Sequence, residues 1–194
     1  MPSATDTRGA ATRAAILDRA VDIASAEGLD GLTIGRLATE LGMSKSGLFG
    51  HFGSKQGLQL ATVEAAALRF REAVVDPVAG APDGAPRLRA MAGAYLDYID
   101  SDLYSGGCFW GATSAEFDDR PGPVRDAIAG ALDAWLGELE RQARAAGVPE
   151  PERLAFELYA LVMGANSRYR LSGERRVFDY ARDSVEALLA ELPG

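Results

Sequence analysis

The residues of this chain that could do chemistry are few, and several of them lie in one short segment. The only two lysines, Lys45 and Lys55, are ten positions apart, and the only histidine, His51, lies between them. A lone histidine cannot by itself build a metal site or a catalytic triad, and Cys108 is the only cysteine. Lysine ammonium groups suit contact with phosphates, which depends on the local charge of a segment and not on the sum over the chain.

The rest of the chain gives no support to an enzyme. The sequence contains no glycine-rich phosphate loop, no cluster of metal ligands and no nucleophile motif. We therefore predict a protein that is not an enzyme and that needs no metal or other cofactor. Two alternatives stay open at single residues. His51 is a neutral polar group near phosphate or a plain surface residue, and Cys108 is an inert packing residue or a redox sensor.

The charge is unevenly spread along the chain. The formal net charge of the 194 residues is −8, which by itself argues against binding to nucleic acid. Residues 1–60, however, hold six acidic and six basic side chains, so that the whole excess of negative charge belongs to residues 61–194. Both lysines lie in the neutral part. The total charge therefore does not exclude a phosphate-binding segment there.

These side chains need a framework that holds them on one surface, and residues 33–51 predict a helix-turn-helix. Thr33 and Ser44 can cap two short helices, and Gly42 can end the first one. The apolar positions that would face inward are Ile34, Leu37, Ala38, Leu41, Leu48 and Phe52. The outward positions of the second helix are then Lys45, Ser46, Gly47, Phe49, Gly50 and His51. In a helix-turn-helix the second helix enters the major groove, where a surface with little bulk allows close approach.

Two glycines inside the second short helix have a cost. Gly47 and Gly50 should each destabilise the helix by roughly 1 kcal/mol relative to alanine. One reason to keep them is close approach of the helix to a partner surface. The alternative is that they merely weaken a helix that tertiary contacts hold in place.

The segment GLTIGRLATELGMSKSGLFGHFGSKQGL resembles the DNA-binding segment of the TetR family of bacterial transcriptional regulators. The likeness covers about residues 10–60, in which helix caps, turn glycines, core positions and Lys55 fall in register. It implies base contacts from Lys45, Ser46 and Gly50, with Gly47 on the same surface. It implies phosphate contacts from Thr33, Phe49, His51 and Lys55. Phe49 departs from the family, which often has tyrosine there and so a phenolic hydrogen bond to phosphate.

The remaining pattern predicts an all-α protein of about nine helices. The chain has 35 alanines and 22 leucines against 22 isoleucines, valines and threonines together, which favours helix. Apolar spacing of three and four residues predicts further helices at about 12–27, from 55, and at about 86–103, 109–117, 124–146, 152–171 and 175–192. Residues 76–86 are rich in Pro, Gly and Ala and predict a loop.

The resemblance implies two domains, with a DNA-binding helix-turn-helix domain at residues 1–55 and an effector-binding and dimerisation domain at 56–194. In the family the last two helices form a four-helix bundle with those of a second copy, although an ordinary intrachain core would show the same periodicity. The implied interface residues are Leu158, Leu161, Val162, Ala165, Val185 and Leu188. A ligand pocket needs apolar walls with a few polar groups, and the candidates are Tyr95, Tyr98, Phe109, Trp110, Phe117, Trp135, Tyr159 and Asn166.

Other classes of protein fit the sequence poorly. One cysteine allows no intrachain disulfide, and we expect no signal peptide, no membrane-spanning segment and a cytoplasmic location. The resemblance implies a ligand-responsive regulator, usually a repressor, that reads an inverted repeat of double-stranded DNA as a homodimer. A small apolar or amphipathic effector would release it. The alternative is a helical protein-interaction module that no longer reads DNA specifically.

Overall fold

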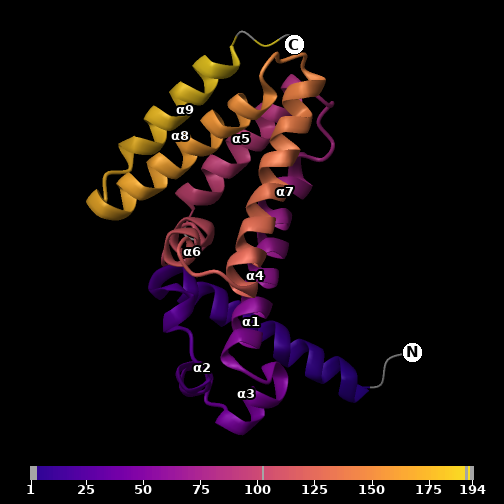
Figure 1. Ribbon diagram of the computed structural model, residues 1–194, viewed down its shortest axis with the longest axis vertical. Coiled ribbons are helices and arrows are strands. Elements are labelled where there is room, and N and C mark those ends of the chain that lie inside the picture. Colours follow the sequence, from indigo (N-terminus) through magenta and orange to yellow (C-terminus); the bar gives the residue numbers. More distant parts are fainter. Residues whose placement is uncertain (1–3, 102, 191, 193–194) are drawn as a thin grey trace. The chain divides into compact units, whose positions relative to one another are not determined.

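The chain is all-α, as its composition and periodicity predict. The computed structural model describes residues 4–101, 103–190 and 192, and these contain nine α-helices and no strand. Along the chain (Figure 1) the helices are α1 (Ala4–Gly31), α2 (Ile34–Glu40), α3 (Lys45–Phe52), α4 (Lys55–Phe70), α5 (Ala85–Asp100), α6 (Phe109–Phe117), α7 (Pro123–Ala145), α8 (Pro151–Ser172) and α9 (Arg176–Leu189). The predicted fold class and number of helices are confirmed.

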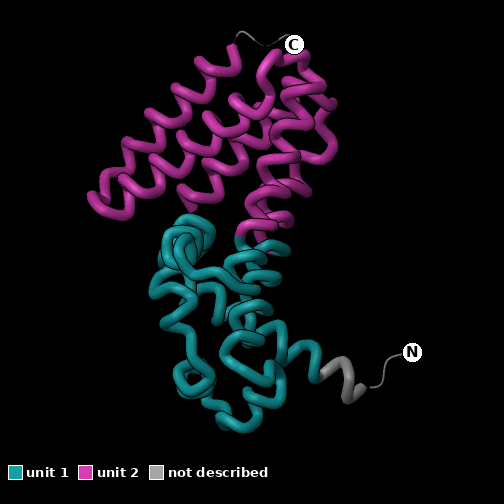
Figure 2. The backbone as a smooth tube through the Cα atoms, in the orientation of Figure 1, with its two compact units in different colours: residues 1–68, 104–128 teal, residues 69–103, 129–194 magenta. Residues whose placement is uncertain are grey.

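The chain divides into two compact units, drawn in teal and magenta in Figure 2. Unit 1 comprises residues 1–68 and 104–128, and unit 2 comprises residues 69–103 and 129–194. The helix-turn-helix therefore shares its unit with α6, which comes much later in the sequence. This grouping results from the tertiary packing, and no local sequence motif predicts it.

Unit 1 is built around α1, whose inward face packs against α6. The buried side chains of that face are Ile16, Leu17, Ala20, Val21, Ile23 and Ala24, spaced as an amphipathic helix requires. The helix begins at Ala4, eight residues before the predicted start. The apolar spacing that gave the prediction begins only at Ile16, and residues 9–11 before it are exposed.

Two glycines allow α6 and the loop before it to approach α1 closely. Gly28 interrupts the helical dihedral angles with φ 79° and ψ 166°, a conformation essentially reserved for glycine. The predicted end of the helix, at about residue 27, lies just before this interruption, but a further turn runs on to Gly31. Gly106 meets α1 directly, because a Cβ atom there would lie 2.0 Å from the backbone of Ser25.

Unit 2 is a helical core in which α5 packs against α8 and α9, and α8 and α9 run side by side (Figure 1). Its fully buried large side chains include Leu88, Met91 and Leu96 of α5, Leu139 of α7 and Phe178 of α9. Buried Gln142 of α7 accepts a hydrogen bond from the backbone N–H of Gly84 at 2.8 Å, and this contact fixes the start of α5.

The residues between α4 and α5 are more regular than predicted at their start. A π-helical turn at Arg71–Val75 and a 3-10 turn at Asp76–Val78 continue the chain beyond α4. The remaining turn is held by Arg87, whose guanidinium donates hydrogen bonds to the carbonyl oxygens of Ala79 and Ala81. The predicted loop therefore exists, but only after Val78.

Candidate nucleic-acid interface

The helix-turn-helix is fixed by two side-chain caps and a small core, as the sequence predicts. The Oγ1 atom of Thr33 accepts a hydrogen bond from the N–H of Arg36 at 3.1 Å, and the Oγ atom of Ser44 accepts one from Gly47 at 3.1 Å. Leu37, Ala38 and Leu48 are fully buried, whereas Ile34, Leu41 and Phe52 are only partly buried. The caps satisfy N–H groups that the start of each helix leaves unpaired.

The outward face of α3 is the surface that the sequence proposed for base contacts. Lys45, Ser46, Gly47, Phe49 and Gly50 are all exposed, and the ring of Phe49 is 53% exposed, which is unusual for a large apolar side chain. His51 is partly buried, with its ring centroid 6.1 Å from that of Phe52. Thr33 is exposed at the start of α2. The predicted DNA-binding residues of α3 and Thr33 are therefore exposed, except His51, which is partly buried.

The two glycines of α3 differ in their surroundings. A Cβ atom on Gly47 would lie 3.0 Å from the Oγ atom of the capping Ser44, so its small size already serves the fold of the chain. A Cβ atom on Gly50 would meet nothing within 4 Å. Nothing in the described part of the chain thus requires glycine at position 50.

Lys45 lies at the first position of α3 and reaches across α2. A Cβ atom on Gly35 would lie 3.3 Å from Cε of Lys45, so the aliphatic stem of the lysine covers that glycine. No carboxylate of the described residues lies within ion-pair distance of its ammonium group. Lys45 is therefore available to an anion or a base edge.

Lys55, predicted to contact phosphate, already has a partner within the chain. Its Nζ atom donates hydrogen bonds to the carbonyl oxygen and to Oδ1 of Asp30, both at 2.9 Å. The hydrogen bond from Lys55 and a second one from Arg120 hold the pKa of Asp30 below its ordinary value. Lys55 remains exposed at the start of α4, where Ser54 caps the helix by accepting a hydrogen bond from Gly57 at 2.9 Å.

Most cations near the helix-turn-helix are neutralised in the same way. Arg19 pairs with Glu40 at 2.8 Å and also with Asp22, and Arg36 pairs with Glu27 at 2.6 Å. Arg13 of α1 differs, because its guanidinium lies over the ring of Phe52 at 5.3 Å and no carboxylate of the described residues pairs with it. Within residues 9–60, where side chains are described, Arg13 and Lys45 are thus the cations without a carboxylate partner.

The candidate ligand-binding aromatics fall into two groups. In unit 2, Tyr95, Tyr98 and Trp135 gather around Phe70, whose ring centroid lies 4.9 Å from that of Trp135. Phe70 was not among the predicted ligand-binding residues. Tyr159 is partly buried and Asn166 is buried, both on α8. The other candidates, Phe109, Trp110 and Phe117, are buried in unit 1.

The indole N–H of Trp135 is a notable feature of the unit 2 cluster. The Nε1 atom is buried and has no hydrogen-bond partner among the described residues. A buried donor without a partner costs about 1–3 kcal/mol, so it is usually explained by water, a ligand or strain. This N–H therefore marks a position at which a hydrogen-bond acceptor would be stabilising.

The candidate interface residues are placed unevenly. Leu158, Val162, Ala165 and Val185 are buried by their own chain, in the packing of α8 and α9, whereas Leu161 and Leu188 are partly exposed. The outer face of these helices carries a shallow groove of about 270 Å³, and its lining consists of Ala160, Leu161, Gly164, Ala165, Arg168, Val177, Tyr180, Ala181 and Ser184. Of these residues, Leu161 and Ala165 were predicted to lie in the interface.

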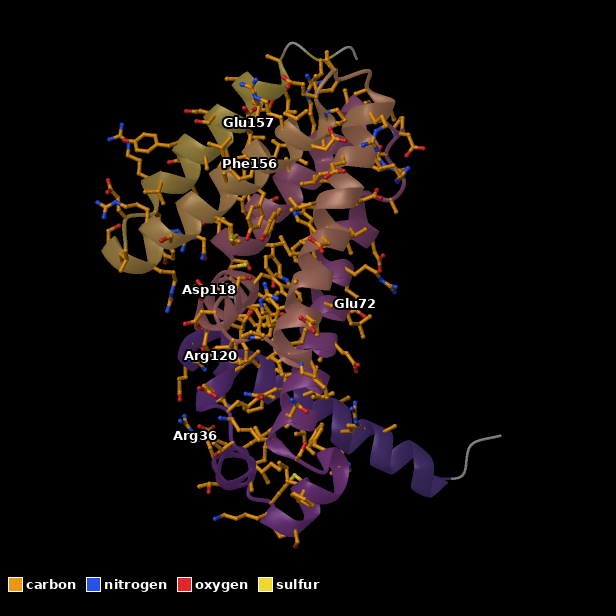
Figure 3. All side chains as sticks on the ribbon, in the orientation of Figure 1. Arg36, Glu72, Asp118, Arg120, Phe156 and Glu157 are labelled. Carbon is orange, nitrogen blue, oxygen red and sulfur yellow. The ribbon has the colours of Figure 1, made fainter. Side chains whose placement is uncertain are left out.

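Exposed apolar side chains flank this groove. Phe156 of α8, labelled in Figure 3, is 65% exposed, and Tyr180 of α9 is 52% exposed. Phe156, Ala160 and Gly164 follow one another at intervals of four, so they lie on one face of α8. That spacing was present in the sequence, but a second apolar stripe on the same helix, the buried one, gave the stronger signal.

In the described part of the chain, no group of three or more His, Cys, Asp or Glu side chains is arranged to hold a metal ion. None of the described helices is both long enough and apolar enough to cross a membrane.

Comparison with known proteins identifies two regions of the sequence. The family model for bacterial regulatory proteins, tetR family, matches residues 16–62. The model for the Tetracyclin repressor-like, C-terminal domain matches residues 84–185, which is just over half of the chain. No curated protein matches the sequence.

Several solved structures share the fold over nearly the whole chain. A TetR transcriptional regulator from Chloroflexus aurantiacus is 23% identical, with a TM-score of 0.86 over 95% of this chain and 97% of that one. A transcriptional regulator from Saccharomonospora viridis, in complex with choline, is 21% identical, with a TM-score of 0.76 over 95% and 100%. AibR, in complex with isovaleryl coenzyme A and operator DNA, is 23% identical, with a TM-score of 0.73 over 91% and 97%.

Proposed function

Because the chain belongs to the TetR family of non-enzymatic, DNA-binding transcriptional regulators, we propose that it is a homodimeric repressor that a small effector releases from an inverted-repeat operator. The observation that carries the proposal is the exposed face of α3. It presents Lys45, Ser46 and Gly50 on a helix that two caps and the buried Leu48 hold in place. A protein acting on the chromosome in this way works in the cytoplasm.

Base reading is assigned to the first two turns of α3. Lys45 can donate hydrogen bonds to guanine, and Ser46 can donate to or accept from either kind of base. Gly50 leaves room for the helix to approach the floor of the groove. Thr33, Phe49, His51 and Lys55 are assigned to the flanking phosphates, with Phe49 in van der Waals contact only. Arg13 joins this group because its charge is not already used by a carboxylate.

A dimer is required because one short helix reads few base pairs. Twofold symmetry lets a second copy read the second half-site, one helical turn or more away. We assign the dimer interface to the outer face of α8 and α9 with Phe156, Ala160, Gly164 and Tyr180 at its centre. Small residues in the groove allow close packing of helices, and the two exposed aromatic rings supply apolar area.

The effector is assigned to the neighbourhood of the unit 2 aromatic cluster. Two proteins with the same fold bind small molecules, isovaleryl coenzyme A in one case and choline in the other. In this chain the walls would be aromatic, and the indole N–H of Trp135 would donate to an acceptor on the ligand. An uncharged, apolar or amphipathic molecule with such an acceptor fits this chemistry. It would release the DNA by binding more tightly to the conformation that does not match the operator.

The experiment that tests the proposal is selection of bound fragments from a random-sequence duplex library at moderate salt, followed by sequencing. Enrichment of an inverted repeat would support a specific dimeric regulator. If a folded, dimeric protein enriched no sequence, even after removal of any co-purified small molecule, the specific regulator would be contradicted. The helical protein-interaction module would then be the better description. A fall of DNA affinity with rising salt separates the two, because phosphate contacts release counterions.

A further inference from the structure

We propose that Asp30 and Arg120 control the phosphate contact of Lys55, so that the loop after α6 tunes DNA affinity through a single lysine. The inference rests on the proposed DNA-binding function and deepens it. Asp30 lies in the last turn of α1, and Arg120 lies beside it in the loop between α6 and α7, where it is labelled in Figure 3. Neither residue belongs to the helix-turn-helix pattern.

The carboxylate of Asp30 is shared between two cations. Its Oδ1 atom accepts a hydrogen bond from Nζ of Lys55 at 2.9 Å, and its Oδ2 atom accepts one from Nη1 of Arg120 at 2.5 Å. All three side chains are about half exposed. The group therefore carries one negative and two positive charges on a surface that solvent, and hence DNA, can reach.

The sum of these charges decides what a phosphate meets at Lys55. An isolated pair of Lys55 and Asp30 is neutral and attracts an anion weakly. With Arg120 added, the group has a net charge of +1, and Lys55 keeps one of its three ammonium N–H donors for a phosphate oxygen. Arg120 thus offsets the effect of Asp30 on Lys55 without itself having to touch the DNA.

The position of Asp30 is fixed from α6. The carboxylate of Glu116 accepts hydrogen bonds from the backbone N–H groups of Leu29 and Asp30 at 2.7 and 2.8 Å. Buried Gln59 of α4 donates to the carbonyl oxygen of Leu29 at 2.9 Å. A displacement of α6 and its following loop would therefore change the positions of both Arg120 and Asp30 relative to Lys55.

The test is a set of double-mutant cycles on the full chain. Affinity for a fluorescein-labelled, mixed-sequence duplex is measured by anisotropy over a series of salt concentrations, because a phosphate contact does not depend on sequence. We expect Asp30→Asn to tighten binding and Arg120→Ala to weaken it, each by about two- to fivefold per protomer, as exposed ion pairs allow. Lys55→Ala should flatten the salt slope by about 0.9 per protomer.

The inference requires that Asp30→Asn and Arg120→Ala change DNA affinity only when Lys55 is present. In the Lys55→Ala background, both Asp30→Asn and Arg120→Ala should leave the affinity unchanged. The matched control is Arg125→Ala, which removes the same charge from a side chain of the same unit that is equally exposed, at 47%. Arg120→Lys, which keeps the charge, should restore most of the wild-type affinity, and thermal unfolding confirms that each variant folds.

The outcomes separate the inference from the function on which it rests. Effects that persist without Lys55, or that Arg125→Ala reproduces, would overturn the inference and show only a change in overall charge. No effect of either variant would overturn it as well. If the folded wild-type protein bound no duplex at any salt concentration, the proposed function itself would fall, and the inference with it.

Discussion

Gly28 and Glu116 are packed so closely that a Cβ atom on the glycine would lie 2.6 Å from Oε2 of the carboxylate. The same carboxylate accepts hydrogen bonds from the next two backbone N–H groups. Glycine at position 28 is thus required twice, for its dihedral angles and for the space that Glu116 occupies.

The first prediction concerns this pair. Gly28→Ala should lower the free energy of unfolding by about 1–3 kcal/mol, because alanine strains the backbone at this conformation. Urea denaturation measures the change. The double variant with Glu116→Ala should recover only the part of the loss that comes from the steric clash. A Gly28→Ala protein as stable as the wild type would contradict the role assigned to the turn.

Gly50→Ala should affect stability and DNA binding in opposite directions. Alanine favours the helix and meets open space, so we expect a gain of about 0.5–1 kcal/mol in unfolding free energy. A methyl group pressed against a groove should cost about 1–3 kcal/mol of binding, as overpacked contacts do. Gly130→Ala, at another open helical glycine, is the control and should leave DNA affinity unchanged. Unchanged affinity for Gly50→Ala would place that residue outside the interface.

Lys45 and Arg13 should respond differently to truncation. Lys45→Ala should relax sequence preference at one base position by about 1–3 kcal/mol, because it removes a donor to a base edge. Arg13→Ala should weaken binding to all sequences and flatten the salt slope, because it removes a phosphate contact. Sequencing of selected fragments measures the change in sequence preference. Titration at several salt concentrations measures the change in the salt slope. The same uniform loss in both variants would show that Lys45 contacts only phosphate.

The assigned dimer face can be tested at a glycine. Gly164→Glu places a charged side chain in the groove between α8 and α9, where the protein's own atoms leave space. The monomer should stay folded, while the dimer should dissociate because a charge would be buried without a partner. Sedimentation velocity measures the association state. Gly137→Glu, at an equally open glycine of α7, should remain a dimer. Survival of the Gly164→Glu dimer would exclude this face.

Asp30 should contribute to a dependence of stability on pH. The hydrogen bond from Lys55, followed by that from Arg120, lowers its pKa in the folded state. Its contribution is therefore complete above the ordinary aspartate pKa of about 3.9, and it is lost as the pH falls through the lowered value. The expected size is at most about 1 kcal/mol, because the three side chains are exposed. Urea titrations of wild type and Asp30→Asn should converge in acid, and a constant difference would contradict the assignment.

The sequence was informative wherever a local rule decides the structure. Thr33 and Ser44 were predicted as caps because their side chains act on N–H groups only a few residues away. The bounds of α6 at Phe109–Phe117 were predicted because glycines precede it and Arg120, Pro121 and Gly122 follow it. In each case the determining interaction joins residues only a few positions apart, so it can be predicted from the sequence.

The features that the sequence did not predict depend on contacts between residues far apart in the chain. The packing of α1, α4 and α6 determines the ion pair between Lys55 and Asp30 and the close approach of Gly106 to Ser25. Residue type was also a poor guide to exposure on α8. It carries two apolar stripes, and only the tertiary packing shows that Leu158 faces the core of its own chain while Phe156 faces outward.

The pairing of Arg19, Arg36 and Lys55 with carboxylates has a consequence for how such a protein would search a chromosome. A DNA-binding surface that neutralises most of its own cations displaces few counterions, so it holds random DNA weakly and only briefly. It would slide over short distances and return often to free diffusion. Specific sites would then be distinguished mainly by DNA shape and base contacts. An effector that removes these contacts would release the protein from the operator, and little protein would remain bound to the neighbouring non-specific DNA.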